Sequence, residues 1–191
     1  MSLSCVTSSP IWPSKEAGGG QSKSLNESWC AVYTMPRHEK FVHARLMAKR
    51  IQSFLPFYTA VRRWRNGIRR EIKHPLWSGY LFVCIGADER IPVLHTPGVR
   101  HIVGDGSLPL ALDDHDIHAL RICGQCTSLL PHPFVCPTNT ICITHGPLQG
   151  LKGYLEKDGC DLMFAVNIHL IQKSFAIRVQ NNGLELADNC L

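Results

Sequence analysis

The strongest chemical signal in this sequence is a run of cations in its first half. Within this run, Glu71 is the only carboxylate. Such a charge density suits phosphate contacts, whose affinity falls with salt and does not depend on base sequence. The alternative is a solvated basic loop that keeps the protein soluble, and the local density favours nucleic-acid contact. Six cations fall within twelve residues, namely Arg62, Arg63, Arg65, Arg69, Arg70 and Lys73.

The cysteines form the second group of residues with possible chemistry. Cys123 and Cys126 make a Cys-x-x-Cys pair that is followed by His132 and Cys136, and four such ligands could hold zinc in tetrahedral geometry. A second paired motif is missing, however, and no thioredoxin-like βαβ pattern surrounds the pair. The nine cysteines are an odd number, which fits reduced and mostly buried thiols better than a disulfide framework. We therefore expect no metal and no cofactor.

Neither catalysis nor membrane insertion is indicated. The ten histidines and the scattered carboxylates give no nucleophile, base and orienting group at a known spacing, and no glycine-rich phosphate loop is present. We interpret His38, His43, His74 and His95 as surface or interface residues. No stretch approaches the ~20 apolar residues that cross a bilayer, and the N-terminal segment lacks the features of a signal peptide. The sequence thus predicts a cytoplasmic protein that is not an enzyme.

The basic run lies within a stretch of alternating strand and helix signals. Val42 and Leu46 are four residues apart, as on one face of a helix. Asp113 is suited to begin another helix. Asn66-Gly67, inside the basic run, indicates a hairpin turn because both residues tolerate positive φ. Strands are expected at 29–33, 54–58, 76–83 and 99–103, and helices at about 37–50, 88–94 and 113–123.

The pattern changes after the last of these helices. Three prolines, Pro131, Pro133 and Pro137, stiffen an extended connection and suggest a domain boundary. Short strands of period two, separated by glycine-containing turns, are best closed as a small barrel, which removes exposed edges. Apolar residues alternate with polar ones at 141–143, 164–170 and 175–179.

We therefore predict an α+β protein with two domains. Residues 1–28, which carry Ser, Gly and Pro, form a flexible tail. A mixed, mostly antiparallel sheet flanked by helices occupies residues 29–126. A proline-containing linker follows at 127–137, and a small SH3-like β-barrel occupies 138–191.

Several segments resemble, in their order, the N-terminal domain of NusG-like factors. The segment 143–153 is similar to a KOW motif, the loop signature of the barrel domain that follows in that family. Matches in the correct order across both domains are specific, and they are closer to specialised paralogs such as RfaH and the antiterminators of polysaccharide operons than to the housekeeping protein. The matching N-terminal segments are Trp29-Cys30-Ala31-Val32-Tyr33, Pro36-Arg37-His38-Glu39-Lys40, Leu76-Trp77-Ser78-Gly79-Tyr80-Leu81-Phe82-Val83 and Thr96-Pro97-Gly98-Val99.

The resemblance implies a transcription elongation and antitermination factor. It would bind the clamp helices of the largest RNA polymerase subunit, favour one conformation of the clamp, and suppress pausing or termination at particular long operons. The basic run would face upstream DNA or the non-template strand, and Arg37, His38 and Lys40 could extend that surface. The matching polymerase-binding positions are Tyr33, Leu76, Trp77 and Tyr80 and, in a poorer match, Glu89 and Arg90.

One motif departs from the family pattern. The usual Phe-Pro-Gly-Tyr reads Trp77-Ser78-Gly79-Tyr80, and we expect its turn to survive because the glycine remains. Core packing is a second interpretation of Trp77 and Tyr80, since the strand that they enter looks buried. Alternation can put the two rings on opposite faces. We favour Trp77 for the interface and Tyr80 for the core.

The KOW segment implies a further partner. In relatives the barrel recruits a ribosomal protein or the termination factor Rho, and the alternative is that the loop only closes the barrel. Competing functions are a housekeeping NusG-type elongation or termination factor and a KOW-type RNA- or ribosome-binding protein. A switch of this domain to helices, as in RfaH, is disfavoured by its period-two pattern and β-branched residues. The loop residues are His145, Gly146, Pro147, Leu148, Gly150 and Gly153.

Overall fold

Strands and helices alternate in the first part of the chain, and strands dominate the second. Of the predicted tail at 1–28, only residues 27 and 28 are described, and residue 28 already belongs to the first strand. The computed structural model describes residues 27–65, 67–106, 108–125, 129–135, 140–144, 148–159, 161–179 and 186–188.

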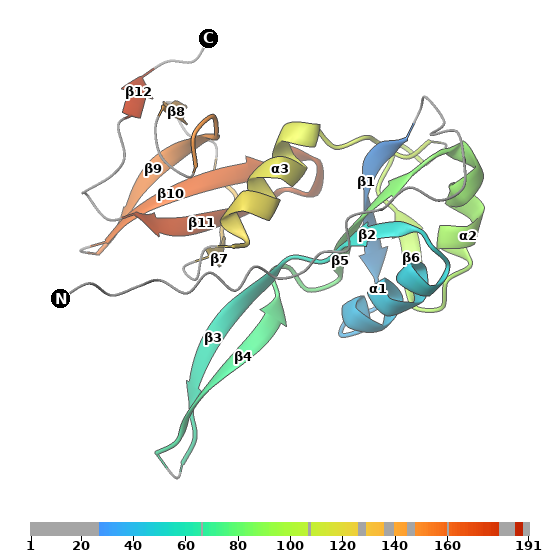
Figure 1. Ribbon diagram of the computed structural model, residues 1–191, viewed down its shortest axis with the longest axis horizontal. Helices are drawn as coiled ribbons and strands as arrows, with labels where there is room; N and C mark the ends of the chain where they lie inside the picture. The colour runs from blue at the N-terminus through green and yellow to red at the C-terminus, as the bar shows by residue number, and fades with distance from the viewer. Residues whose placement is uncertain are drawn as a thin grey trace, which may run out of the picture.

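The first sheet has four antiparallel strands. Alternating residues of its central strand divide between two faces. Cys30 and Val32 join one apolar cluster with Val42, whereas Trp29 and Ala31 belong to the cluster on the other face. The strands are β1 (Ser28–Thr34), β2 (Gln52–Phe54), β5 (Tyr80–Ile85) and β6 (Val99–Ile102), in the order β2-β5-β1-β6 (Figure 1).

Four helical segments accompany this sheet: α1 (Glu39–Ala48), η1 (Ala87–Glu89), α2 (Arg90–Leu94) and α3 (Asp114–Cys123). The first is shorter than the predicted 37–50 because Arg37 and Arg50 both have positive φ, which a right-handed helix excludes. The prediction that Asp113 begins a helix is confirmed, since its carboxylate accepts a hydrogen bond of 2.9 Å from the amide of His115. In the part of the chain that the structure describes, no helix is long and apolar enough to span a membrane.

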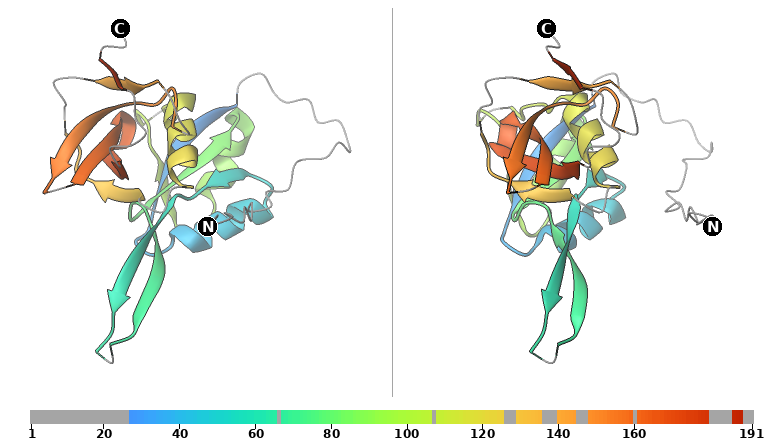
Figure 2. Two further views of the ribbon diagram at one scale, coloured as in Figure 1. Left: turned by 60° about the vertical axis from the view of Figure 1, so that its left-hand side comes forward. Right: turned by 90° about the vertical axis from the view of Figure 1, so that its left-hand side faces the viewer.

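A two-stranded ribbon leaves the first sheet between β2 and β5. It consists of β3 (Phe57–Arg63) and β4 (Arg69–Pro75), paired antiparallel. Figure 1 and both views of Figure 2 show it extending away from the rest of the molecule. The predicted turn is confirmed, but its strands extend into the basic run: β3 shares only Phe57 and Tyr58 with the predicted run 54–58, and β4 ends before the predicted run 76–83.

The second sheet has six strands in the order β12-β8-β9-β10-β11-β7, and every pair is antiparallel. The predicted runs 141–143 and 175–179 lie in strands, and the predicted run 164–170 is a strand only as far as Ile168, after which a short helix begins. The edge strand β7 lies inside the predicted linker at 127–137, so part of that segment pairs with β11. The strands are β7 (Leu129–His132), β8 (Ile141–Ile143), β9 (Lys152–Asp158), β10 (Asp161–Ile168), β11 (Lys173–Val179) and β12 (Leu186–Asp188), with a short helix η2 (His169–Ile171) between β10 and β11.

One apolar cluster runs through both sheets. It contains Trp29 and Phe82 from the first sheet, Leu120 from α3, and Phe164 and Phe175 from the second sheet. Helix α3 lies between the two sheets (Figure 1). The second sheet therefore covers part of the face of the first sheet that is opposite to α1.

Candidate functional site

The basic ribbon carries all six predicted cations on exposed positions. Its register places Arg62 opposite Arg70 and Arg63 opposite Arg69. Gly67 has φ of 79°, and the turn is closed by a hydrogen bond of 2.9 Å from the Gly67 amide to the Trp64 carbonyl. Asn66 lies outside the described residues. Among the residues that are described, no carboxylate forms an ion pair with any of these six side chains.

The extension of this basic surface onto α1 is only partly supported by the geometry. The ammonium group of Lys40 donates to the Lys73 carbonyl at 3.3 Å and lies 5.4 Å from the centroid of the Phe57 ring. Lys40 is therefore adjacent to the base of the ribbon. Arg37 and His38 are exposed beside the start of α1.

A buried carboxylate organises the turn before β5. Glu39, at the start of α1, is 3% exposed and accepts a hydrogen bond of 2.6 Å from the Gly79 amide. Gly79 has φ of 82°, and a Cβ atom there would lie 3.1 Å from the ring of Tyr33. The turn thus survives without the proline because its glycine permits positive φ and Glu39 holds it in place. The role of Glu39 was not predicted.

An aromatic row crosses the face of the first sheet that is opposite to α1. Tyr33 is paired with Tyr80 on β5 and with His101 on β6, and its ring centroid lies 5.1 Å from that of Tyr80 and 5.2 Å from that of His101. The two tyrosines are half-buried and the histidine is exposed. Burial, with a smaller contribution from Tyr33, raises the pKa of Tyr80. Tyr80 was expected in the core, and it packs against the shared apolar cluster while remaining half-buried in this row.

Leu76 and Trp77, which continue this face, are covered. Trp77 is 6% exposed, and its indole Nε1 donates a hydrogen bond of 3.2 Å to the Ser174 carbonyl of β11. Its ring also packs against Phe82 and Phe175, with centroid distances of 6.2 and 6.3 Å. The expectation that Trp77 is an exposed interface residue is therefore corrected for this arrangement of the two sheets, because the second sheet covers it.

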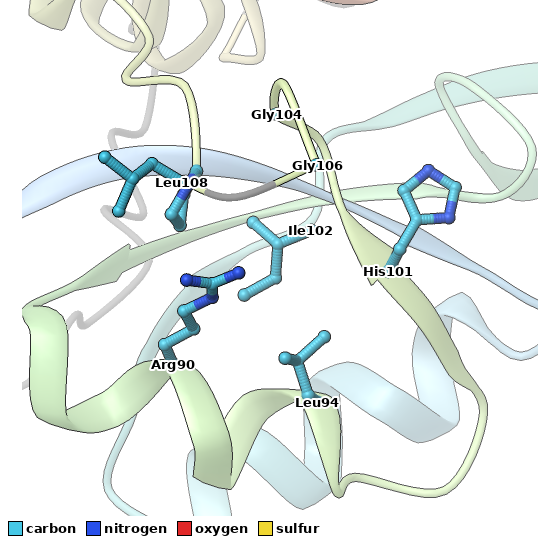
Figure 3. Close-up of a pocket in the computed structure, with 8 residues that line it drawn as sticks. Arg90, Leu94, His101, Ile102, Gly104, Gly106 and Leu108 are labelled. Carbon is cyan, nitrogen blue, oxygen red and sulfur yellow. The ribbon is translucent and has the colours of Figure 1, made fainter.

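The other predicted polymerase positions lie around η1 and α2. The carboxylate of Glu89 accepts a hydrogen bond of 3.2 Å from the Gly86 amide, which caps the helical segment. Arg90 lines a cavity of about 370 Å³ together with Leu94, His101 and Leu108. In Figure 3 the guanidinium of Arg90 points into this cavity. The cavity therefore adjoins the aromatic row at His101.

The predicted KOW loop is described only in part. His145, Gly146 and Pro147 lie outside the described residues. Leu148 is buried, and Gly150 has φ of 84°. Gly153 belongs to β9, where a Cβ atom would collide with the carbonyl oxygen of Ala165 and the ring of Phe164.

A second contact between the two parts of the chain involves α3. The imidazole Nε2 of His115 lies 3.1 Å from the carbonyl oxygen of Gly150, as in a hydrogen bond. The next residue, Asp116, lines a cavity with residues of β9 and β10. Burial, with a smaller effect of the Asp113 charge, raises the pKa of Asp116 to about 6. These contacts place a titratable group where α3 meets the second sheet.

The cysteine pair is not assembled into a site by the described residues. Cys123 is buried in the shared apolar cluster, and Cys126 and Cys136 lie outside the described part of the chain. The imidazole of His132 instead lies 3.3 Å from the carboxylate of Glu156. Nowhere in the described ranges do three or more His, Cys, Asp or Glu residues form a group that could hold a metal ion.

Comparison with known proteins agrees with this fold. The family model described as "Transcription termination factor nusG" matches residues 27–121. The solved structure "Domain interaction in Thermotoga maritima NusG" has a TM-score of 0.52 and 16% identity, covering 84% of this chain and 97% of that chain. "Crystal Structure of MjSpt4:Spt5 complex conformation B" has a TM-score of 0.28 and 15% identity, with coverage of 84% and 97%. The comparison with curated protein sequences gives no match.

The first sheet, its helices and the basic ribbon together form a NusG domain, so this chain is a NusG-like transcription factor. More specifically, it is a transcription elongation factor of the NusG family.

Proposed function

We propose that this protein binds the clamp helices of the largest RNA polymerase subunit through the aromatic row and the apolar face around it. The main observation in support of this proposal is the row of Tyr33, Tyr80 and His101. This row lies at the open edge of an otherwise buried apolar face. Interface centres are rich in such aromatic side chains. The family of the chain supports polymerase as the partner.

Leu76 and Trp77 complete this binding face once the second sheet moves away. Both residues are on the covered side of the first domain, and polymerase can reach them only when β11 separates from them. The polar contacts that oppose this separation include the bonds from Trp77 to Ser174 and from His115 to Gly150. Polymerase would thus select the open arrangement of the protein.

The basic ribbon would contact nucleic acid of the elongation complex, on its upstream duplex or its non-template strand. Its six cations are exposed, and Lys40 lies at its base. Arg37 and His38 would add to this surface, while Glu89 and Arg90 would contact the opposite lobe of polymerase, Arg90 from the cavity beside α2.

The second sheet would act as a KOW-type, SH3-like barrel over 138–191, joined by the linker at 127–137. Its loop, from His145 to Gly153, would recruit a ribosomal protein or Rho. The whole molecule would then be a cytoplasmic, non-enzymatic antitermination factor for particular long operons, similar to RfaH in this respect. Support for the barrel comes from the six-stranded antiparallel order and from the glycine-dependent packing of β9 on β10.

A single-round transcription assay with purified polymerase tests this proposal. The wild-type protein should shorten pauses and increase readthrough of a terminator. Tyr33→Ala and Tyr80→Ala should each lose most of this effect, whereas Phe41→Ala, which removes an exposed aromatic ring on α1, should retain it. Circular dichroism checks that each variant is folded. A wild-type protein without effect on pausing or readthrough would contradict the proposal.

A further inference from the structure

The tip of the basic ribbon carries an exposed tryptophan that the functions above do not use. Trp64 is 55% exposed, whereas Trp29 and Trp77 are 7% and 6% exposed. Trp64 belongs to none of the apolar clusters formed by the described residues. Its ring is therefore available to a partner outside the chain.

The ribbon has two faces of different chemistry. Arg62 and Arg70 are opposite each other in the register and share one face. The guanidinium of Arg70 lies over the ring of Trp64, 5.9 Å from its centroid, so Trp64 belongs to this same face. We call Arg62, Trp64 and Arg70 the tryptophan face.

The opposite face carries the other arginine pair but no aromatic ring at the tip. Arg63 pairs with Arg69 there, and Val61 pairs with Glu71, the only carboxylate of the ribbon. Alternation of side chains along the strands keeps this carboxylate away from the tryptophan face. The tryptophan face thus combines cations and an aromatic ring without a neighbouring negative charge on its own side.

The charge of the ribbon defines the class of partner. Residues 57–75 contain six cations and one carboxylate, so their net charge of +5 equals that of the whole chain, and the remaining residues are neutral in total. Like charges directly opposite each other on two strands destabilise a ribbon, and both arginine pairs do so here. Phosphates bound beside the ribbon would remove this repulsion, so a polyanion is the fitting partner.

We infer that the tryptophan face binds an unpaired nucleotide, with its base stacked on Trp64 and its neighbouring phosphates held by Arg62 and Arg70. In a duplex both faces of each internal base are occupied by its neighbours, and inserting a side chain between them costs a few kcal/mol of unstacking, so a protruding indole stacks most readily on an unpaired or terminal base. Base stacking on an aromatic side chain tolerates any sequence. The ribbon therefore recognises single-stranded nucleic acid, or the end of a duplex beside it, and not duplex phosphates alone. This inference rests on the nucleic-acid contact proposed above and specifies its ligand.

Fluorescence anisotropy with the full-length protein and short labelled oligonucleotides tests this inference. At equal salt, the wild type should bind oligodeoxythymidine more tightly than a blunt duplex of the same length. Trp64→Ala should weaken single-strand binding by on the order of 10-fold or more, with little change for the duplex, and Trp64→Tyr should restore most of the affinity. An oligouridine arm distinguishes RNA from DNA as the source of the unpaired nucleotide.

A charge-matched pair of double variants separates stacking geometry from charge. Arg62→Gln with Arg70→Gln should weaken single-strand binding more than Arg63→Gln with Arg69→Gln, although both remove two cations. The slope of log affinity against log salt should become shallower by about 0.7 for each phosphate that a variant no longer binds. Trp64→Ala should leave this slope unchanged, because the indole carries no charge.

Three results would overturn the inference. The first is equal affinity of the wild type for single strand and duplex, and the second is an unchanged single-strand affinity in Trp64→Ala. The third is a Trp64→Ala variant that loses binding to vesicles of the anionic lipid phosphatidylglycerol but keeps binding to oligonucleotides, which would make a membrane surface the partner. Binding to core polymerase without nucleic acid should be the same in Trp64→Ala and wild type. Failure of the stacking inference is thereby distinguishable from failure of polymerase binding.

Discussion

Glu39 links the start of α1 to the turn that precedes β5, and this link bears on stability and on the binding face together. Its carboxylate accepts from the amides of Gly79 and Arg37, at 2.6 and 3.3 Å. The Gly79 turn in turn places Tyr80 beside Tyr33. A buried hydrogen bond to a charged group stabilises a fold more than a neutral one.

Replacing Glu39 should therefore lower the free energy of unfolding, by an amount that depends on whether the new side chain keeps an acceptor oxygen. Glu39→Ala leaves the Gly79 amide without its acceptor, and we expect the free energy of unfolding to fall by about 2–3 kcal/mol. Glu39→Gln keeps an acceptor oxygen and should cost about 1 kcal/mol. Urea unfolding measures both, with the exposed Glu71→Ala as a control near wild type. A Glu39→Ala variant as stable as the control would show that the hydrogen bond contributes nothing.

Asp116 gives the second prediction at this scale. Because burial raises its pKa to about 6, the folded protein favours the neutral acid over the charged form. The preference of the folded protein for the neutral acid adds to the free energy of unfolding below the ordinary pKa of 3.8. This contribution is lost as the pH rises through about 6. Asp116→Asn should accordingly be more stable than wild type at about pH 7, by about 1 kcal/mol after allowance for partial exposure.

The pH dependence shows whether the stability gain of Asp116→Asn comes from the burial of this carboxyl or from the loss of any negative charge on the helix. The advantage of Asp116→Asn in urea unfolding should shrink toward about pH 4, where the wild-type acid is neutral as well. Asp114→Asn, which changes an exposed carboxylate on the same helix, is the matched control. If both variants follow the same pH profile, the burial of Asp116 has no energetic consequence.

At the scale of elements, α3 depends on its first residues. The Asp113 carboxylate accepts from the His115 amide at 2.9 Å, as an N-cap does. Asp113→Ala should lower the free energy of unfolding by about 1 kcal/mol, and Asp113→Asn by much less. Since α3 packs against both sheets, thermal unfolding followed at the near-ultraviolet tryptophan signal should show this loss. Equal melting of the two variants would argue against a capping role.

The elements of the first domain were largely predictable because their signals are local. The N-cap Asp113 and the hairpin turn at Gly67 each act within a few residues. The ribbon strands beyond Tyr58 were missed because charged side chains on both faces obscure their alternation. β7 was missed because prolines suggested a linker, yet Pro131 is tolerated in this edge strand opposite Phe175.

The binding face could be predicted only in part. Tyr33 and Tyr80, which the resemblance named as polymerase-binding positions, are brought together by strand pairing. Core packing of Trp77 was the less favoured interpretation, and the strand that covers it could not be identified from the sequence, because its partner Ser174 lies 97 residues further along the chain. The roles of Glu39 and Trp64 were also missed, since a helix-start carboxylate and a turn tryptophan have no distinctive pattern in sequence.

At the scale of the whole molecule, the docked second sheet covers part of the proposed polymerase-binding face. The Trp77 indole donates to a buried carbonyl of β11, and Trp77→Phe removes this donor while keeping an aromatic ring. Loss of this hydrogen bond should weaken docking by about 0.5–1.5 kcal/mol. If the docked state predominates, apparent affinity for polymerase should rise by up to about tenfold. Trp77→Ala, which also removes the ring that would contact polymerase, should bind more weakly than wild type.

The most direct test of the account is the affinity of the full-length protein for core RNA polymerase, measured for wild type, Trp77→Phe and Trp77→Ala and for polymerase without the clamp-helix tip. The account predicts tighter binding by Trp77→Phe, weaker binding by Trp77→Ala, and loss of binding to the truncated polymerase. Absence of wild-type binding at low salt, or equal binding to the truncated polymerase, would contradict it.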